Sequence, residues 1–414
     1  MKILVHATLY PEGVGKKRAN TTLFMHTYAA EWVRQGHQVL VIHHRVLFPK
    51  AMVAIGRRLL ALPGMARARE FLDGYGDDPD ADLVIDGVPV LRRAMYKLAP
   101  RSLFPRRLIR KRAALCREIL ARRNFRPDAV VCDFINPGLF VALEMDLKPI
   151  AAVLHRTCME YFARRATARG ALDAIRHSDM VAFRSGEGRR KFEARYFKPA
   201  RGFLMPSGVP ASRARPESEF TPRTGVRKFL CVARLTARKH VSAVVRAFGA
   251  VDAPGATLTI VGDGDQRELL ADLAARQPNA AAIEFAGQLT REQVLARMAD
   301  CDCFALVSER ETFGMAYVEA MSTGAIPIGS VGEGIADIID DGVNGLLSPA
   351  GDAAALEVRM RQLIALPAER VAALSRRAFD TTHALRDDLL AAAAIENLCG
   401  CEQAGRLQEN GDAV

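Results

Sequence analysis

The 414-residue sequence has no apolar run of the roughly 18 residues that span a bilayer, and its first residues lack the build of a signal peptide. We therefore expect a cytoplasmic protein. The eight cysteines are scattered, and the close pairs, Cys301/Cys303 and Cys399/Cys401, are C-x-C rather than the C-x-x-C of zinc or thioredoxin-like sites. We expect reduced, mostly buried thiols. No helix-turn-helix, zinc-finger or RNA-binding signature is present, so nucleic acid is not an expected partner.

Acidic residues are scarce in the first half of the chain. Residues 1–210 carry 37 Lys and Arg against 19 Asp and Glu, a net charge of +18, whereas residues 211–414 carry 21 against 28, a net charge of −7. A half this basic favours an anionic partner, such as membrane phospholipid or an anionic acceptor. The basic centre runs from Arg101 to Arg126, where apolar residues recur at helical spacing. Its cations either form a solvated face or contact an anionic membrane surface. In the second case the protein would be peripheral on the inner face of the membrane.

The stretch from Ser308 to Leu347 contains the pattern with the clearest chemical meaning. Glu311 follows an apolar run of strand length, and Glu319 lies eight positions later, on the helix predicted over 316–322. Ligands bind beyond the carboxyl ends of parallel strands, and helix N-termini offer N–H groups to anions. Because carboxylates accept hydrogen bonds from vicinal hydroxyls, the stretch predicts a ligand with a phosphate and several hydroxyls. The alternative is a helix-start carboxylate and a solvated glutamate.

The residues E-T-F-G-M-A-Y-V-E resemble the Glu-x7-Glu signature of retaining glycosyltransferases of the GT4 family, which have the GT-B fold. Further motifs in the same order span nearly the whole chain. The resemblance implies an α/β protein with two doubly wound Rossmann-like domains that face each other across a cleft. The implied parts are an acceptor-binding domain (1–209), a linker or hinge (210–227), a nucleotide-sugar-binding domain (228–380), a C-terminal helix that crosses back to the first domain (381–405) and a disordered tail (406–414).

The same resemblance implies roles for individual residues. Arg234 and Lys239 would hold the donor diphosphate, Glu311 the hydroxyls of the donor sugar, and Glu319 the ribose, while His155 would lie beside the transferred sugar. A lone histidine is otherwise more often structural. The remaining implied donor contacts are Gly262, Gly264, Leu289, Phe313, Gly314, Met315, Ala316 and Gly334.

The sequence departs from the family pattern at several glycines. Ala233 and His240 replace two glycines of the motif that contains Arg234 and Lys239, and Glu333 adds a side chain where the family has a Gly-Gly pair. In the first loop, Gly13 and Gly15 come earlier than the family's phosphate-binding glycines. They are interpreted either as a phosphate loop or as ordinary turn glycines.

The reaction implied is transfer, with retention, of a hexosyl-type group from a UDP- or GDP-sugar to a glycan or lipid-linked acceptor. The setting would be bacterial cell-surface polysaccharide or glycolipid synthesis. We expect no metal or other cofactor, because two cations and oriented N–H groups would offset the charge of the leaving group. Two alternatives stay open: another GT-B sugar-nucleotide enzyme, such as an epimerase, and a non-catalytic GT-B subunit.

Overall fold

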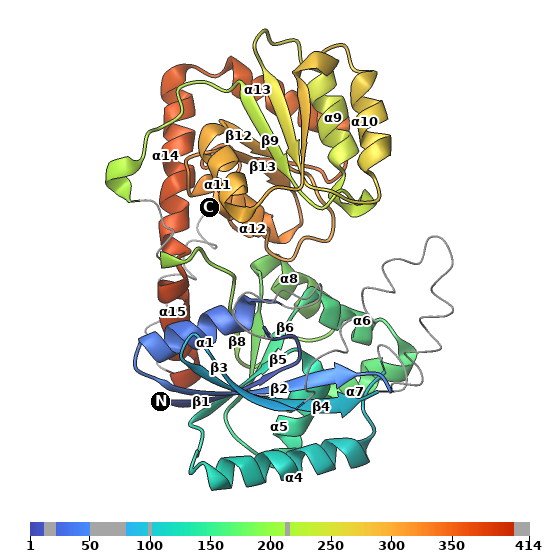
Figure 1. Ribbon diagram of the computed structural model, residues 1–414, viewed down its shortest axis with the longest axis vertical. Helices are drawn as coiled ribbons and strands as arrows, with labels where there is room; N and C mark the ends of the chain where they lie inside the picture. The colour runs from blue at the N-terminus through green and yellow to red at the C-terminus, as the bar shows by residue number, and fades with distance from the viewer. Residues whose placement is uncertain (12–21, 50–79, 98–101, 212–215, 401–414) are drawn as a thin grey trace. The chain divides into compact units, whose positions relative to one another are not determined.

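The computed structural model describes residues 1–11, 22–49, 80–97, 102–211 and 216–400, which fall into two compact units (Figure 1). The first unit comprises Met1–Phe183, Phe192–Met205 and Ala391–Val414, and the second comprises Arg184–Lys191 and Pro206–Leu390. The domain boundaries given above stay a prediction. Within the described ranges, no helix is both long and apolar enough to cross a bilayer.

The first unit contains an eight-stranded sheet in the order β3-β4-β2-β1-β5-β6-β7-β8. Neighbouring strands are parallel except for the antiparallel pair β3 and β4. From β1 the chain builds the sheet first on one side, through β2, and then on the other, from β5 onward, so the sheet is doubly wound. Its strands are β1 (Lys2–Ala7), β2 (Gln38–Leu47), β3 (Ala81–Ile85), β4 (Val88–Tyr96), β5 (Ala129–Asp133), β6 (Ile150–Leu154), β7 (Met180–Phe183) and β8 (Gly202–Leu204).

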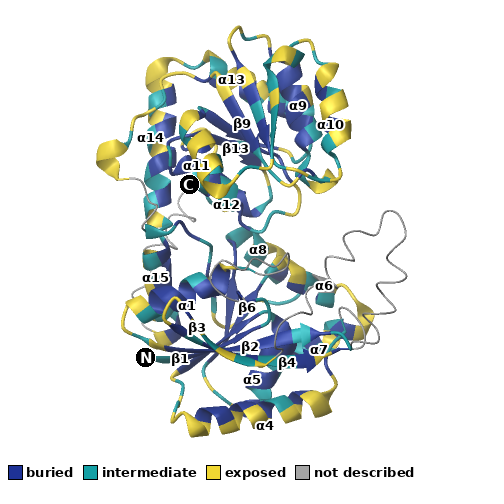
Figure 2. Cartoon of the chain, in the orientation of Figure 1, coloured by how far each residue is buried: buried dark blue, intermediate teal, exposed yellow. Residues whose placement is uncertain are grey.

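Helices cover both faces of this sheet. In Figure 1, α4 and α5 lie on one face and α1 on the other. Helix α4 has one buried and one exposed side (Figure 2), because Ile109, Ala113 and Cys116 pack into the core while its cations, except the half-buried Arg112, face solvent. The helices are α1 (Phe24–Arg34), α4 (Arg106–Arg122), α5 (Phe140–Met145), α6 (Met159–Phe162) and α7 (Arg165–Arg176), with the short turns η1 (Ile135–Leu139) and η2 (Arg156–Cys158).

The second unit contains a six-stranded parallel sheet in the order β11-β10-β9-β12-β13-β14. Figure 1 shows α9, α10 and α13 on one face and α11, α12 and α14 on the other. The strands are β9 (Lys228–Val232), β10 (Thr257–Val261), β11 (Ile283–Gly287), β12 (Cys303–Ala305), β13 (Ile326–Ser330) and β14 (Leu346–Ser348). The helices are α9 (Val241–Ala250), α10 (Arg267–Ala275), α11 (Arg291–Asp300), α12 (Met315–Met321), α13 (Ala353–Ala365) and α14 (Ala368–Ala384), with the turns η4 (Glu217–Glu219), η5 (Ala237–Lys239), η6 (Ala280–Ala282) and η7 (Gly334–Asp337).

Two helices run from one unit into the other along the chain: α8 (Gly186–Arg195) and α15 (Asp387–Cys399). The helix expected over 381–405 is therefore divided, because α14 ends at Ala384 and α15 begins three residues later. In the first unit, the indole N–H of Trp32 donates to the Ala391 carbonyl at 3.0 Å. The tail at 406–414 lies outside the described residues.

Two other expectations meet the structure directly. Part of the segment expected to be a linker packs on α14, where the ring of Phe220 stacks on Phe379 with centroids 4.4 Å apart. The cysteines that the structure describes are free thiols, and all except Cys399 are buried, which confirms the expected state of the thiols for this part of the chain.

Candidate functional site

The centre of the second sheet lies between β9 and β12. The chain proceeds from β9 to β10 and β11 on one side, and from β12 to β13 and β14 on the other. Adjacent strands whose connections diverge in this way define the switch point at which α/β sheets bind ligands. The loops that follow these two strands contain the predicted residues Arg234, Lys239 and Glu311.

Glycines bring the loop after β10 into backbone contact with the loop after β9. A Cβ atom at Gly262 would overlap the carbonyl oxygen of Ala233, and one at Gly264 would overlap that of Leu235. Gly262 also has a φ of 131°, which L side chains rarely adopt. The contact between the two loops therefore requires glycine at both positions, independently of any donor contact.

An ion pair joins the loops after β9 and β12. The ammonium of Lys239 binds Oε2 of Glu311, and the two side chains are only 13% and 18% exposed. The Glu309 N–H also donates to the Arg238 carbonyl at 2.9 Å. His240, which replaces a family glycine, has the left-handed conformation (φ 47°) that glycine favours. The structure thus brings two of the predicted site residues together.

The loop after β13 completes this arrangement around Glu311. Oε2 of Glu333 accepts the Glu311 backbone N–H at 2.7 Å, and the Gly334 N–H donates to the Glu311 carbonyl at 3.2 Å. A Cβ atom at Gly334 would overlap the Thr312 carbonyl oxygen. Ser308 Oγ donates to Oε2 of Glu311 at 3.3 Å. The loops after three strands therefore converge on one glutamate.

Glu319 lies on α12 and pairs with Arg291, the first residue of α11. The Glu319 side chain is largely buried, with 14% exposed, whereas 41% of the Arg291 side chain is exposed. The Arg291 partner of Glu319 was not anticipated from the sequence. Its position at the start of α11 gave no local signal, because the contact joins residues 28 positions apart.

Other predicted donor contacts differ in what they present. Arg234 is exposed and has no ion pair with any residue that the structure describes. The Phe313 ring is buried in a small cluster with Val209 and Val318, so only its backbone is available to a ligand. Gly314 precedes α12 in a left-handed conformation (φ 89°), and the helix begins at Met315, with Ala316 next, where the first N–H groups have no intrahelical partner. Leu289 lies just past β11 and is half-buried.

In the first unit, His155 follows β6 at the carboxyl edge of the sheet. Its Nε2 lies 2.6 Å from Oδ1 of Asp133, the last residue of β5. Asp133 is fully buried, and its Oδ2 has no hydrogen-bond partner in the described part of the chain. The His155 ring stacks on Phe134 with centroids 3.9 Å apart and meets Phe24 edge-on at 5.4 Å. Asp133 was missed in the sequence, although its place at a strand end was a usable signal.

Deeper in the same unit, two imidazoles lie against each other without any charge. Nδ1 of His6 is 2.8 Å from Nε2 of His44, and the rings are stacked. Burial lowers the pKa of His6 to about 3, and burial together with the neighbouring His6 lowers the pKa of His44 well below its ordinary range. Both rings are therefore neutral at neutral pH. The first-loop candidates Gly13 and Gly15 lie outside the described residues.

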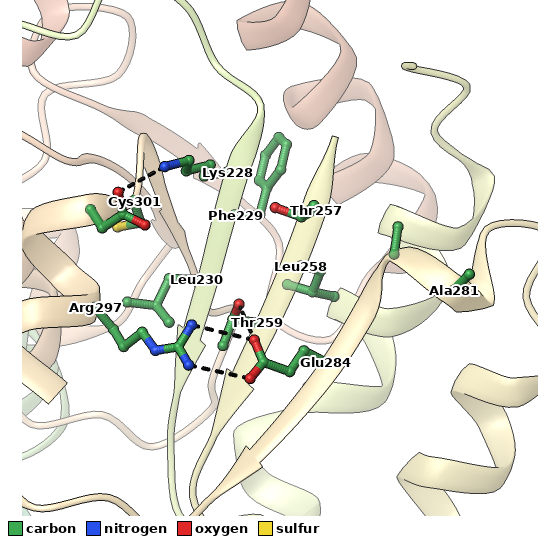
Figure 3. Close-up of a pocket in the computed structure, with 12 residues that line it drawn as sticks. Lys228, Phe229, Leu230, Thr257, Leu258, Thr259, Ala281, Glu284, Arg297 and Cys301 are labelled. Carbon is green, nitrogen blue, oxygen red and sulfur yellow. Dashed lines mark hydrogen bonds and ion pairs between the residues drawn. The ribbon is translucent and has the colours of Figure 1, made fainter. Parts of the chain in front are cut away.

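A cavity of about 260 Å³ lies at the opposite, amino end of the second sheet (Figure 3). Lys228 and Thr257, which begin β9 and β10, line it, and no predicted donor residue does. Its charged side chains pair with one another, because Arg297 binds Glu284 at 3.3 Å and Lys228 binds Asp300 at 2.7 Å. We therefore place the candidate site at the carboxyl edge instead.

Solved structures share the architecture described above. The crystal structure of Anabaena Alr3699/HepE in complex with UDP and glucose matches 97% of this chain and 100% of its own, with a TM-score of 0.64 and 17% identity. The apo form of the lipopolysaccharide outer core galactosyltransferase WaaB matches 97% and 99%, with a TM-score of 0.65 and 16% identity. The predicted fold is confirmed: the chain has the GT-B fold of two doubly wound α/β units.

The sequence of the second unit matches a family model. Residues 215–380 match the model described as glycosyl transferases group 1, which agrees with the predicted resemblance. The glycogen synthase of Mycobacterium tuberculosis is 29% identical over 282 residues, which are 64% of this chain and 66% of the relative. The GDP-mannose-dependent alpha-mannosyltransferase of Corynebacterium glutamicum is 36% identical over 116 residues, 28% of this chain and 26% of the relative. The matches thus span less than two thirds of these relatives.

Proposed function

We propose that this protein is a retaining glycosyltransferase that moves a hexosyl-type group from a UDP- or GDP-sugar to a glycan or lipid-linked acceptor. The setting would be bacterial cell-surface polysaccharide or glycolipid synthesis. The observation that carries the proposal is the convergence of three loops on the Lys239–Glu311 pair, inside the segment that matches the family. The similar proteins support it: one relative is a glycogen synthase, another depends on GDP-mannose, and one structural neighbour contains UDP and glucose.

The donor would bind at the carboxyl edge of the second sheet. Arg234 and Lys239 would hold the diphosphate, since guanidinium and ammonium groups both bind phosphate oxygens. Glu311 would accept hydrogen bonds from hydroxyls of the donor sugar, and Glu319 from the ribose. The backbone near Gly262, Gly264 and Gly334, and that of Leu289 and residues 313–316, would complete the contacts.

The chemical step breaks the bond between the anomeric carbon and the diphosphate and forms a bond to an acceptor hydroxyl, whose proton leaves. Negative charge grows on the departing nucleoside diphosphate, so cations already placed there lower the barrier. Arg234 and Lys239 would supply that charge, and His155 would act beside the transferred sugar. We propose that no divalent cation is needed, so EDTA should leave the turnover number unchanged.

A donor panel tests the proposed function. Purified protein is mixed with UDP-, GDP- and ADP-sugars, with and without membrane extract, and both binding and nucleotide release are measured. We expect one donor to bind tightly and its nucleotide to be released only when acceptor is present. Release of an altered sugar without acceptor would indicate an epimerase-like enzyme. Donor binding without any release would indicate a non-catalytic subunit.

We further propose that α4 contacts an anionic membrane surface, which would suit a lipid-linked acceptor. The support is its composition: Arg106, Arg107, Arg110 and Lys111 are exposed, and so are Leu108 and Leu115, at 40% and 36%. Glu144 offsets part of this charge, because it pairs with Arg110 at 3.2 Å. Cations interleaved with exposed leucines are typical of helices that lie on membranes.

Flotation with vesicles of anionic phospholipid tests the membrane contact. The double variant Arg107→Glu/Lys111→Glu should lower the bound fraction at least fivefold, because each cation near such a surface contributes about 1 kcal/mol. The matched control reverses two exposed cations of the second unit, Arg246 and Arg276, and should bind as the wild type does. Equal binding of the three proteins would contradict the proposal.

A further inference from the structure

The loop after β13 contains a glutamate between two glycines, Gly332-Glu333-Gly334. Glu333 is half-buried, and it has an extended backbone immediately before η7. Its carboxylate binds the protein, because Oε2 accepts the backbone N–H of Glu311 at 2.7 Å. The side chain that departs from the family's Gly-Gly pair thus binds the residue at the centre of the candidate site.

The backbones of the two loops hold this bond in place. The Gly334 N–H donates to the Glu311 carbonyl at 3.2 Å, and the absence of a side chain at Gly334 lets the loop lie against the Thr312 carbonyl. Glu333 and Gly334, which are adjacent in the chain, therefore both bind the backbone of Glu311, and we call these two contacts the clamp. A hydrogen bond from a backbone N–H to a carboxylate is short and stronger than one between neutral groups.

Glu311 is consequently held at two separate points. Lys239 and Ser308 bind its side-chain Oε2, and Glu333 and Gly334 bind its backbone N–H and carbonyl. The orientation of the Glu311 carboxylate depends on both, since a rotated peptide would move the side chain away from Lys239. A donor that must exchange hydrogen bonds with this carboxylate meets it already oriented.

We propose that Glu333 is a positioning residue that holds Glu311 in the orientation required for the donor sugar. This inference rests on the proposed function, in which Glu311 binds sugar hydroxyls. It adds that Glu333, which stands where the family has a glycine, uses its side-chain carboxylate to fix the loop after β12. Loss of the carboxylate should therefore weaken donor binding more than it slows the chemical step.

Two variants separate the hydrogen bond from the charge. Glu333→Ala removes both, whereas Glu333→Gln keeps an oxygen that accepts the Glu311 N–H and removes only the charge. We expect Glu333→Ala to raise the KM for the donor about tenfold with kcat changed less than threefold, and Glu333→Gln to recover most of the loss. A merely structural defect would lower the active fraction, and so kcat, without moving KM.

Asp302 provides a matched control at the other edge of the same sheet. Its Oδ2 accepts the backbone N–H groups of Arg227 and Lys228 at 2.9 and 2.8 Å, so Asp302→Ala removes the same kind of bond away from the site. We expect this control to lower the free energy of unfolding and to leave the KM unchanged. A donor KM of Glu333→Ala equal to that of the wild type would overturn the inference.

Hydrogen exchange tests the clamp independently of activity. In the ligand-free protein, the Glu311 amide should exchange at least fivefold faster in Glu333→Ala than in the wild type, and Asp302→Ala should leave it unchanged. If the wild type transfers no sugar but this amide responds, the proposed function fails and the clamp stands. An amide that exchanges at the same rate in both proteins would refute the clamp.

Discussion

The carboxyl edges of the two sheets hold polar side chains of different character. In the second unit, partly exposed charges neutralise one another, Lys239 with Glu311 and Arg291 with Glu319. In the first unit, an imidazole lies on a fully buried carboxylate. Paired charges can exchange partners when an anion arrives, with a smaller loss of hydration than unpaired ones would suffer. The buried carboxylate instead fixes the orientation of a ring.

The largest expected effect tests the charged edge. Arg234→Ala should lower kcat about 10³-fold, because this exposed cation would face the charge that peaks in the transition state. Steady-state kinetics with the donor identified by the panel provides the measurement. The neighbouring exposed cation gives a matched control, since Arg238→Ala should stay within threefold of the wild type. Turnover by Arg234→Ala close to that of the wild type would remove the leaving-group role.

At the carboxyl edge of the first sheet, activity should depend on the charge of Asp133 even when the volume of its side chain is kept. Asp133→Asn keeps the shape but removes the charge that faces Nε2 of His155, and we expect kcat to fall about 10²-fold. Trp32, the single tryptophan, is buried in the first unit, so its fluorescence shows whether that unit is folded. A variant with wild-type fluorescence and wild-type kcat would show that the His155–Asp133 pair is structural only.

These two edges also show what the sequence reveals. Buried parallel strands appear in the sequence as continuous apolar runs, so the apolar run predicted before Glu311 contains β12 (Cys303–Ala305), and the helix predicted over 316–322 is α12 (Met315–Met321). Glu311 and Lys239 were predicted as members of one site from motif order. Their direct pairing was not predicted, nor was the bond from Glu333, because both depend on how loops from distant strands meet. The spacing of residues along the chain does not predict such contacts.

Acid should destabilise the first unit through its buried imidazoles. The pKa of His6 is about 3 in the folded chain and about 6.5 when unfolded, so between these values the unfolded chain binds more protons and stability falls as the pH falls. One such imidazole should lower the free energy of unfolding by about 2 kcal/mol between pH 7 and pH 5.

Urea unfolding followed by Trp32 fluorescence measures this loss for the first unit. The His6–His44 pair should produce a difference in the free energy of unfolding between pH 7 and pH 5. In the variant His6→Asn, about half of this difference should be lost. The exposed His177, which lies at the end of α7, provides the control, and His177→Gln should keep the full difference. If acid destabilised all three proteins equally, burial of His6 would not be the cause.

The smallest expected effect concerns the second charged pair of the second unit. Glu319→Ala should raise the Kd of the donor about tenfold, which corresponds to the loss of one hydrogen-bonded carboxylate. Arg291→Ala removes only the ligand-free partner of that carboxylate and should change the Kd less than threefold. Calorimetric titration of the single and double variants forms a cycle. If Glu319 binds the ribose, the double variant should match Glu319→Ala; if the pair is purely structural, both single variants should weaken the donor equally.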